Sequence, residues 1–258
     1  MMLEQIKTFV LDMDGTIYLG ERLFPYTMDF LHKVKAAGKD FCFFTNNSSK
    51  NRAAYLQKLS RMGIDIDPSQ MLISNDVILR WLNEHYAGKS AYVVGTPALL
   101  EDFQAAGVRL AERDADYVVL GFDTTLTYEK LVIACDLIRG GAPVFGVNPD
   151  LNCPTETGFI PDCGSISALV KASTGVQCEF FGKPSPHTLR YLLTATGRRP
   201  EELAVVGDRL YTDIAVAAGT AVTSILVMSG ETTPDMLSES EIKPDLVVEH
   251  IGKLSELL

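Results

Sequence analysis

The sequence predicts an α/β protein with a Rossmann-like parallel-sheet core and an inserted α/β cap domain. Short apolar runs alternate with segments of helical period, which is the pattern of a parallel sheet with crossover helices. Several of these runs stop abruptly at polar residues, as strands do at the edge of such a sheet. Between the two halves of this pattern lies a further αβ series of roughly 100 residues, enough for a second domain.

The two ends of the chain supply the core. In the first part we expect strand 6–11, helix 26–37, strand 41–44, a helix ending near Met62, and strand 71–74. In the last part we expect strand 203–206, a helix ending near Ala218, and strand 224–228. Polar residues follow the first, second and fourth of these strands, so we expect any ligand to bind at this edge of the sheet.

The intervening stretch is too long for a βα loop, which usually has about 2–6 residues. It reads as helix 77–85, strand 91–94, helix 98–106, strand 117–121, helix 128–138, strand 144–147 and helix 165–173. We therefore expect a discontinuous core at residues 1–78 and 180–258, and a cap domain at residues 79–179.

Charge and composition narrow the classes of partner. The net charge of −10 opposes binding to a nucleic-acid polymer. No apolar run reaches the ~18 residues that a membrane helix needs, and the N-terminus lacks a signal-peptide layout. The five cysteines form no CxxC pair, which favours reduced thiols and a cytoplasmic location. The four histidines show no metal-ligand spacing.

Two carboxylates follow the first strand, in the segment Asp12-Met13-Asp14-Gly15-Thr16. In an extended chain, residues two apart point the same way, so both carboxylates can face one site. Aspartate-rich turns are also common structural caps, and this motif alone does not separate the two interpretations.

Three further segments sit at comparable positions. Thr45, Asn46 and Asn47 end the second strand, where a hydroxyl and free N–H groups can bind an anion or simply cap a helix. Lys183 lies between Gly182 and Pro184 at a helix entrance and is a candidate phosphate ligand.

Asp208 and Asp213 follow a later strand, in Gly207-Asp208-Arg209-Leu210-Tyr211-Thr212-Asp213. With Asp12 they could form an oxygen-rich site, which suits Mg²⁺ better than Zn²⁺.

The order of these segments is more specific than any one of them. DxDGT, Thr-Asn-Asn, Gly-Lys-Pro and GDxxxTD, in this order, resemble the four motifs of the haloacid dehalogenase superfamily. The long insertion after the second motif resembles that superfamily's class II cap. The stretches LDMDGTIY (residues 11–18), FTNNSS (residues 44–49) and GVNPD (residues 146–150) resemble the NagD-like, or 4-nitrophenyl-phosphatase-like, group.

The resemblance implies a phosphoric monoester hydrolase that works through an aspartyl-phosphate. Asp12 is then the nucleophile, and Asp14 protonates the leaving oxygen and later activates water. Thr45 and Asn46, with Asn47 beside them, are expected to bind the phosphoryl oxygens, and Lys183 to offset charge on the nucleophile and the phosphate.

The same resemblance implies Mg²⁺ as the cofactor. Asp12, Asp208 and the backbone carbonyl of Asp14 are expected to bind it, with Asp213 as a nearby carboxylate of the metal site. Electrostatics supports a metal, because a carboxylate attacking a phosphate at 4 Å meets about 4 kcal/mol of repulsion for each charge pair at an effective dielectric near 20.

Other activities stay open at this point. Asp14 favours phosphate over carbon–halogen chemistry, because dehalogenating members of the superfamily typically lack that aspartate. Phosphotransfer to another acceptor, or phosphate sensing without turnover, are the alternatives. The expected substrates are small phosphorylated metabolites such as sugar, nucleotide or polyol phosphates, with 4-nitrophenyl phosphate in vitro. Asn148, Asp150 and a loop at Gly158–Ser165 are the cap candidates for specificity. A homodimer is compatible with the sequence.

Overall fold

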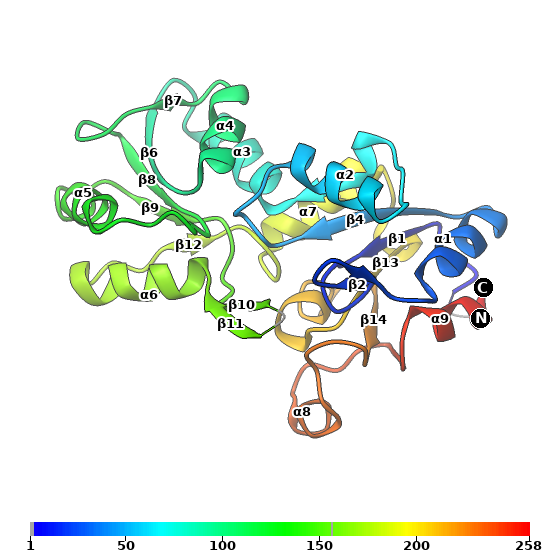
Figure 1. Ribbon diagram of the computed structural model, residues 1–258. Coiled ribbons are helices and arrows are strands. Elements are labelled where there is room, and N and C mark those ends of the chain that lie inside the picture. The colour runs from blue at the N-terminus through cyan, green and yellow to red at the C-terminus, as the bar shows by residue number, and fades with distance from the viewer. Residues whose placement is uncertain (1–2, 156) are drawn as a thin grey trace. The chain divides into compact units, whose positions relative to one another are not determined.

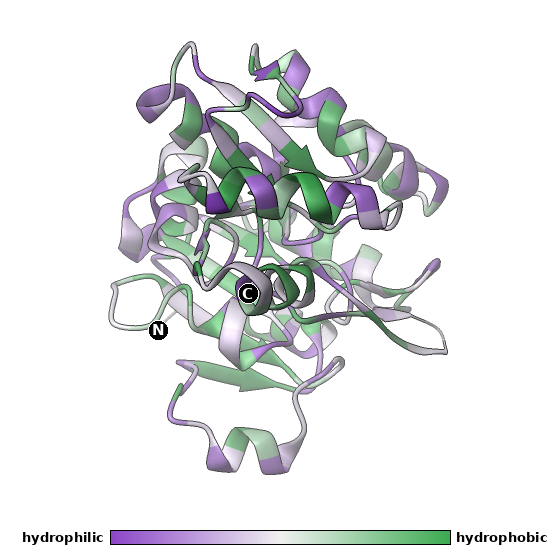
Figure 2. Ribbon diagram, turned by 90° about the vertical axis from the view of Figure 1, so that its left-hand side faces the viewer, coloured by the Kyte–Doolittle hydropathy of each residue, from purple (hydrophilic) through white to green (hydrophobic). Residues whose placement is uncertain are grey.

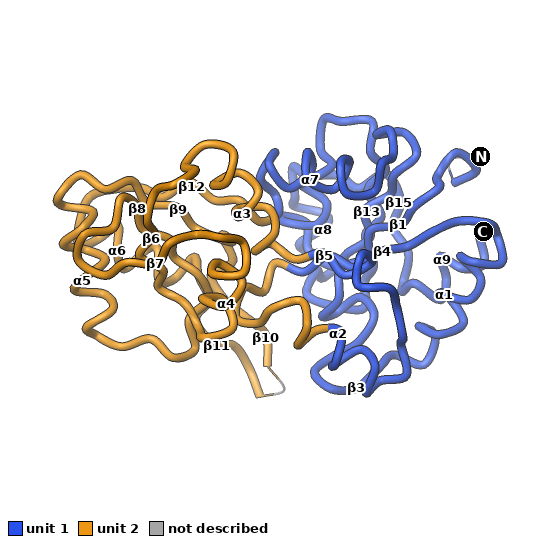
Figure 3. Tube along the Cα trace, turned by 90° about the horizontal axis from the view of Figure 1, so that it is seen from above, with its two compact units in different colours: residues 1–45, 56–72, 183–258 blue, residues 46–55, 73–182 orange. Residues whose placement is uncertain are grey.

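The computed structural model describes residues 3–155 and 157–258 of the chain (Figure 1). It divides into two compact units (Figure 3). Unit 1 comprises Met1–Thr45, Leu56–Leu72 and Lys183–Leu258, and unit 2 comprises Asn46–Tyr55 and Ile73–Gly182. The expected cap, residues 79–179, falls wholly within unit 2, which also includes the short segments 46–55, 73–78 and 180–182.

Unit 1 is built on a six-stranded sheet in the order β15-β14-β13-β1-β4-β5. The strands are β1 (Thr8–Leu11), β4 (Asp40–Thr45), β5 (Met71–Ile73), β13 (Leu203–Gly207), β14 (Thr223–Val227) and β15 (Leu246–Val248). Strand β1 pairs in parallel with β13 on one side and with β4 on the other. Leu11 is in register with Val206 and with Phe43, so these three strands end side by side.

Full burial explains the apolar runs seen in the sequence. All residues of β1, β13 and β14 are buried, as expected for central strands of a parallel sheet that is covered on both faces. The helices of unit 1 are α1 (Thr27–Ala36), α7 (Pro186–Thr196), α8 (Pro234–Glu239) and α9 (Ile251–Leu254), and α2 (Arg52–Arg61) is divided between the two units. A small hairpin of β2 (Tyr18–Leu19) and β3 (Arg22–Leu23) follows the turn after β1.

Unit 2 contains a five-stranded sheet in the order β12-β9-β8-β6-β7, whose strands pair in parallel. Its strands are β6 (Ser90–Val94), β7 (Arg109–Leu110), β8 (Tyr117–Leu120), β9 (Val144–Gly146) and β12 (Glu179–Phe180). Its helices are α3 (Ser74–His85), α4 (Pro97–Ala105), α5 (Tyr128–Arg139) and α6 (Cys163–Thr174). The antiparallel hairpin of β10 (Asn152–Thr155) and β11 (Gly158–Pro161) forms a separate sheet.

The fold class predicted from the sequence is confirmed, since a parallel α/β core carries a further α/β sheet. Hydrophobic colour concentrates on the strands, whereas helices alternate between hydrophobic and hydrophilic residues (Figure 2). Among the described residues, no helix has the length and hydrophobicity to span a bilayer.

Two local expectations are wrong. The helix expected from Asp208 to about Ala218 is a single π-helical turn, Leu210–Ile214, followed by turns. The carboxylate of Asp213 accepts a hydrogen bond from the Arg209 N–H, and the Ile214 and Ala215 N–H groups bond to carbonyls five residues back, which widens the turn. The loop expected at Gly158–Ser165 is instead strand β11 followed by the start of α6, because Asn152–Thr155 pairs with it.

Candidate active site

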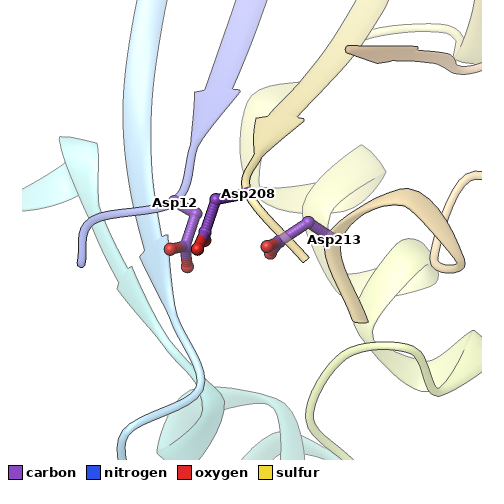
Figure 4. Close-up of side chains that lie close together, drawn as sticks. All are labelled: Asp12, Asp208 and Asp213. Atoms are coloured by element: carbon purple, nitrogen blue, oxygen red, sulfur yellow. The ribbon is translucent and has the colours of Figure 1, made fainter. Parts of the chain in front are cut away.

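Three aspartates of unit 1 lie together at the carboxyl ends of neighbouring strands (Figure 4). Asp12 follows β1, Asp208 follows β13, and Asp213 lies on the π-helical turn. One carboxylate oxygen of each lies within 4.8 Å of the others. The register of β1 with β13 brings the first two together, and the Asp12 N–H donates to the Val206 carbonyl at 2.8 Å.

Lys183 provides the positive charge of this cluster. Its Nζ donates to Asp12 Oδ1 at 2.7 Å and to Asp213 Oδ1 at 2.5 Å, and the side chain is 2% exposed. Burial lowers the pKa of Lys183, but Asp12 and Asp213 raise it more, so the ammonium stays charged. The Nζ also donates to the Phe44 carbonyl of β4 at 3.4 Å, which fixes the lysine between the two aspartates.

The aspartates are in excess over this one cation. Burial and the nearby Asp213 hold the pKa of Asp12 well above its usual range, against the opposing effect of Lys183. Burial and Asp213 likewise raise the pKa of Asp208 to about 7. Burial is the largest cause of both raised pKa values, and a cation bound at the cluster would lower them.

Glycines surround two of these carboxylates closely. A Cβ on Gly230 would lie 2.0 Å from Asp208 Oδ2, and one on Gly15 would lie 2.6 Å from the same atom. Gly15 also has φ +82°, in the left-handed region that glycine tolerates best. A Cβ on Gly207 would lie 2.2 Å from Asp213 Cγ. Larger residues at these positions would push the carboxylates out of place.

The donor set fits a hard divalent cation. Asp208 Oδ2 accepts the Glu231 N–H at 2.6 Å, whereas Asp208 Oδ1 is buried and has no hydrogen-bond partner among the described residues. A buried carboxylate oxygen is costly to leave without a donor or a cation. Three carboxylates and no nitrogen or sulfur ligand form a group that matches Mg²⁺.

A loop after β14 holds this arrangement, and the sequence reasoning missed it. The Ser229 hydroxyl donates to the Gly15 carbonyl at 2.7 Å, and the Thr232 hydroxyl donates to the Asp208 carbonyl at 2.5 Å. Arg209 Nε lies 2.8 Å from Glu231, which fixes the loop to the π-helical turn. The only sequence signal was Gly230, shortly after a strand end.

Asp14 lies beside the cluster, in the turn after β1, and is half-buried. The hydroxyl of Tyr18 donates to Asp14 Oδ2 at 3.2 Å. Thr45 is the last residue of β4 and is buried. These positions in unit 1 are compatible with the roles that the motifs imply.

Asn46 and Asn47 belong to unit 2 and are bonded there. Asn46 Nδ2 donates to Asp150 Oδ2 at 2.8 Å, and Asn47 Nδ2 lies 3.6 Å from Cys153 Sγ. Asn148 Nδ2 also donates to Asp150 Oδ2, at 2.9 Å, and Asn148 Oδ1 accepts from the Ser48 hydroxyl at 2.7 Å.

Asp150 is 4% exposed and accepts from both amides, so it holds the segment after β4. The sequence reasoning named Asn148 and Asp150 but did not foresee their link to Asn46.

Comparisons with known proteins agree with this geometry. Residues 9–109 match the family described as haloacid dehalogenase-like hydrolase, and residues 180–254 match one described as HAD-hydrolase-like. An acid sugar phosphatase of Staphylococcus aureus (strain MRSA252) is 33% identical over 94% of both chains. The structure of a 4-nitrophenylphosphatase from Thermotoga maritima is 41% identical, covers 99% of this chain and 98% of its own, and gives a TM-score of 0.96.

A second solved structure extends the likeness. NagD from E. coli K-12 is 27% identical, covers 96% of this chain and 98% of its own, and gives a TM-score of 0.88. The matches run along nearly the whole chain, and the sequence motifs, the fold and the aspartate cluster agree with them. The chain therefore belongs to the haloacid dehalogenase-like hydrolases and is, within that family, a NagD-like phosphatase, a phosphoric monoester hydrolase.

Proposed function

We propose that the protein hydrolyses small phosphomonoesters, sugar phosphates among them, in a Mg²⁺-dependent reaction that passes the phosphoryl group through Asp12. One observation carries the proposal: the Asp12 carboxylate is held by a buried lysine, 2.7 Å away, within an otherwise acidic cluster. The Staphylococcus aureus relative is an acid sugar phosphatase, which supports sugar phosphates as a substrate class.

Asp12 is the proposed nucleophile. Its free carboxylate oxygen attacks phosphorus, forming an O–P bond while the bond from phosphorus to the ester oxygen breaks. Lys183 holds the other oxygen, so the attacking atom keeps one orientation. Asp14 gives its proton to the departing oxygen and so yields the alcohol.

The second half of the reaction regenerates the enzyme. Asp14, now ionised, takes a proton from water as the water oxygen attacks phosphorus. The bond between phosphorus and Asp12 breaks, inorganic phosphate leaves, and both carboxyl groups return to their starting states. Thr45, Asn46 and Asn47 are proposed to bind the phosphoryl oxygens.

Asp12, Asp208 and the Asp14 carbonyl would hold Mg²⁺, with Asp213 close by. Bound there, the ion supplies positive charge that keeps the carboxylates ionised and offsets the charge of the phosphate. Without such charge, each carboxylate–phosphate pair at 4 Å costs about 4 kcal/mol at an effective dielectric near 20.

Turnover measurements test this function. Purified protein is assayed against a panel of sugar, polyol and nucleotide phosphates and 4-nitrophenyl phosphate, in EDTA and after Mg²⁺ is restored. We expect activity only with Mg²⁺. We expect none in Asp12→Asn, because a neutral amide lacks the anionic oxygen that attacks phosphorus. Undiminished hydrolysis in chelator, or by the Asn variant, would contradict the proposal.

We also propose a cytoplasmic location. All five cysteines lie in the described part of the chain and are free thiols, as a reducing compartment allows. Fractionation of cells that produce the protein tests this, and recovery of the activity outside the cytoplasmic fraction would contradict it.

A further inference from the structure

Tyr18 is buried beside the proposed proton donor. Its side chain is fully buried, and its hydroxyl donates to Asp14 Oδ2 at 3.2 Å. We propose that Tyr18 is a positioning residue, which holds the Asp14 carboxyl group in the orientation for proton transfer and is itself fixed by Lys58. This inference rests on the acid–base role proposed for Asp14.

The backbone fixes Tyr18 to the turn that carries Asp14. The Gly15 N–H donates to the Tyr18 carbonyl at 2.8 Å, and Asp14 and Tyr18 form an isolated bridge. Tyr18 then pairs with Leu23 across the β2–β3 hairpin. Movement of the tyrosine relative to the aspartate would break these bonds, so the phenol reaches the carboxylate from a fixed position.

Lys58 of α2 packs against one face of the Tyr18 ring. Its Nζ lies 3.8 Å from the ring centroid, and its side chain is only 7% exposed. The carboxylate of Glu21 is 3.9 Å from this Nζ but 63% exposed, so it is a solvent-screened partner. A cation over a ring face attracts its π electrons, and the phenol O–H is then more polarised and a better donor.

This arrangement suits a group that must act twice. Asp14 is proposed to give a proton to the leaving oxygen and then to take one from water, and both transfers require one of its oxygens at a set position. A donor on Oδ2 limits rotation of the carboxyl group. The half-buried position of Asp14 allows substrate to reach it.

The test compares leaving groups. A 4-nitrophenolate ion leaves readily without a proton, whereas an alkoxide such as that of glycerol phosphate needs one. In Tyr18→Phe we expect the single-turnover rate of alcohol release, measured before the water step, to fall by about tenfold for glycerol phosphate, a part of the full effect of general acid catalysis. For 4-nitrophenyl phosphate we expect the single-turnover rate of 4-nitrophenolate release to change by less than about twofold, whereas hydrolysis of the aspartyl-phosphate should slow equally for both substrates.

A matched variant controls for the loss of a buried phenol. Tyr117 is buried in strand β8 of unit 2, and Tyr117→Phe removes a hydroxyl of the same kind. It should change the two substrates equally. Lys58→Met should shift the substrate ratio in the same direction as Tyr18→Phe, by less, and serves in its place if Tyr18→Phe does not fold.

A double variant separates the positioning role of Tyr18 from the acid–base role of Asp14 on which it rests. If Asp14→Asn slows the release of the two leaving groups equally, the general-acid role of Asp14 is wrong and the inference falls with it. If Asp14→Asn affects glycerol phosphate selectively, then Tyr18→Phe should add little in that background. Full additivity, or a substrate ratio in Tyr18→Phe equal to that of Tyr117→Phe, would overturn the positioning role alone.

Discussion

Removing one carboxylate from the aspartate cluster should stabilise the protein while it destroys activity. In Asp208→Asn the amide oxygen can still accept the Glu231 N–H, so the buried hydrogen bond is kept. The negative charge is lost from a cluster of three carboxylates, of which Lys183 pairs with Asp12 and Asp213 but not with Asp208. In chelator, the Asn variant should therefore unfold at a higher temperature than the wild type.

The magnitude follows from the raised pKa of Asp208, about 7 in the folded protein. An aspartate in an unfolded chain titrates near ~4, so between these pH values the folded state holds a proton that the unfolded state releases. Rising pH then lowers the free energy of unfolding, by up to about 4 kcal/mol at pH 8. The amide of Asp208→Asn is itself a buried polar group, so we expect the variant to recover about half of this free energy of unfolding. That gain corresponds to a rise in Tm of about 5 °C.

Thermal unfolding in EDTA across pH measures this effect. The gain should be present at pH 8, shrink as pH falls through 7, and vanish near pH 4. With excess Mg²⁺ the order should reverse, because only the wild type is stabilised by binding the ion. An Asn variant no more stable than wild type at pH 8 in EDTA would refute the charge imbalance inferred for the cluster.

Asp40 provides a control of opposite sign in the same unit. A hydrogen bond from Lys35, together with Arg198, lowers the pKa of this carboxyl group. A lowered pKa stabilises the folded state above the unfolded pKa, and that stability is lost as pH falls. Asp40→Asn should therefore lower Tm at pH 8, and the loss should disappear in acid.

Two further changes have outcomes set by the structure. Gly230→Ala should raise the Mg²⁺ concentration for half-maximal activity at least about tenfold, since the new methyl would displace Asp208. The control is Gly38→Ala, where a Cβ meets nothing within 4 Å, and it should lower Tm without changing that Mg²⁺ concentration. Equal dependence of activity on Mg²⁺ in the two variants would contradict this prediction. Asp150→Ala should destabilise the protein by about 2 kcal/mol, as measured by urea unfolding, because it removes the buried carboxylate that accepts hydrogen bonds from the amides of both Asn46 and Asn148; a loss below about 0.5 kcal/mol would contradict it.

The sequence predicted the parts of the site that depend on strand ends. Asp12 and Asp208 could be placed together because parallel strands of one sheet end at a common edge, and burial made those strands visible as apolar runs. Lys183 was found from its position between glycine and proline, but its two aspartate partners depend on tertiary packing.

Contacts between segments that are distant in the sequence could not be predicted from it. The loop at Ser229–Thr232 matches no motif, and its role comes from hydrogen bonds to Gly15 and Asp208 and from the ion pair of Glu231 with Arg209. The π-helical turn was read as a helix because its apolar residues have helical spacing. The hairpin at Asn152–Pro161 was missed because its strands are largely exposed and carry no alternating apolar pattern.

Chemical trapping of the phosphorylated enzyme tests the central claim most directly. Borohydride reduces an acyl phosphate to an alcohol, so an aspartyl-phosphate becomes homoserine while a free aspartate does not react. Enzyme quenched during turnover of a phosphomonoester with Mg²⁺, reduced and digested for mass spectrometry should carry homoserine at residue 12, and none should form without substrate. Homoserine at residue 14 or 208, or unmodified Asp12 throughout turnover, would contradict Asp12 as the nucleophile.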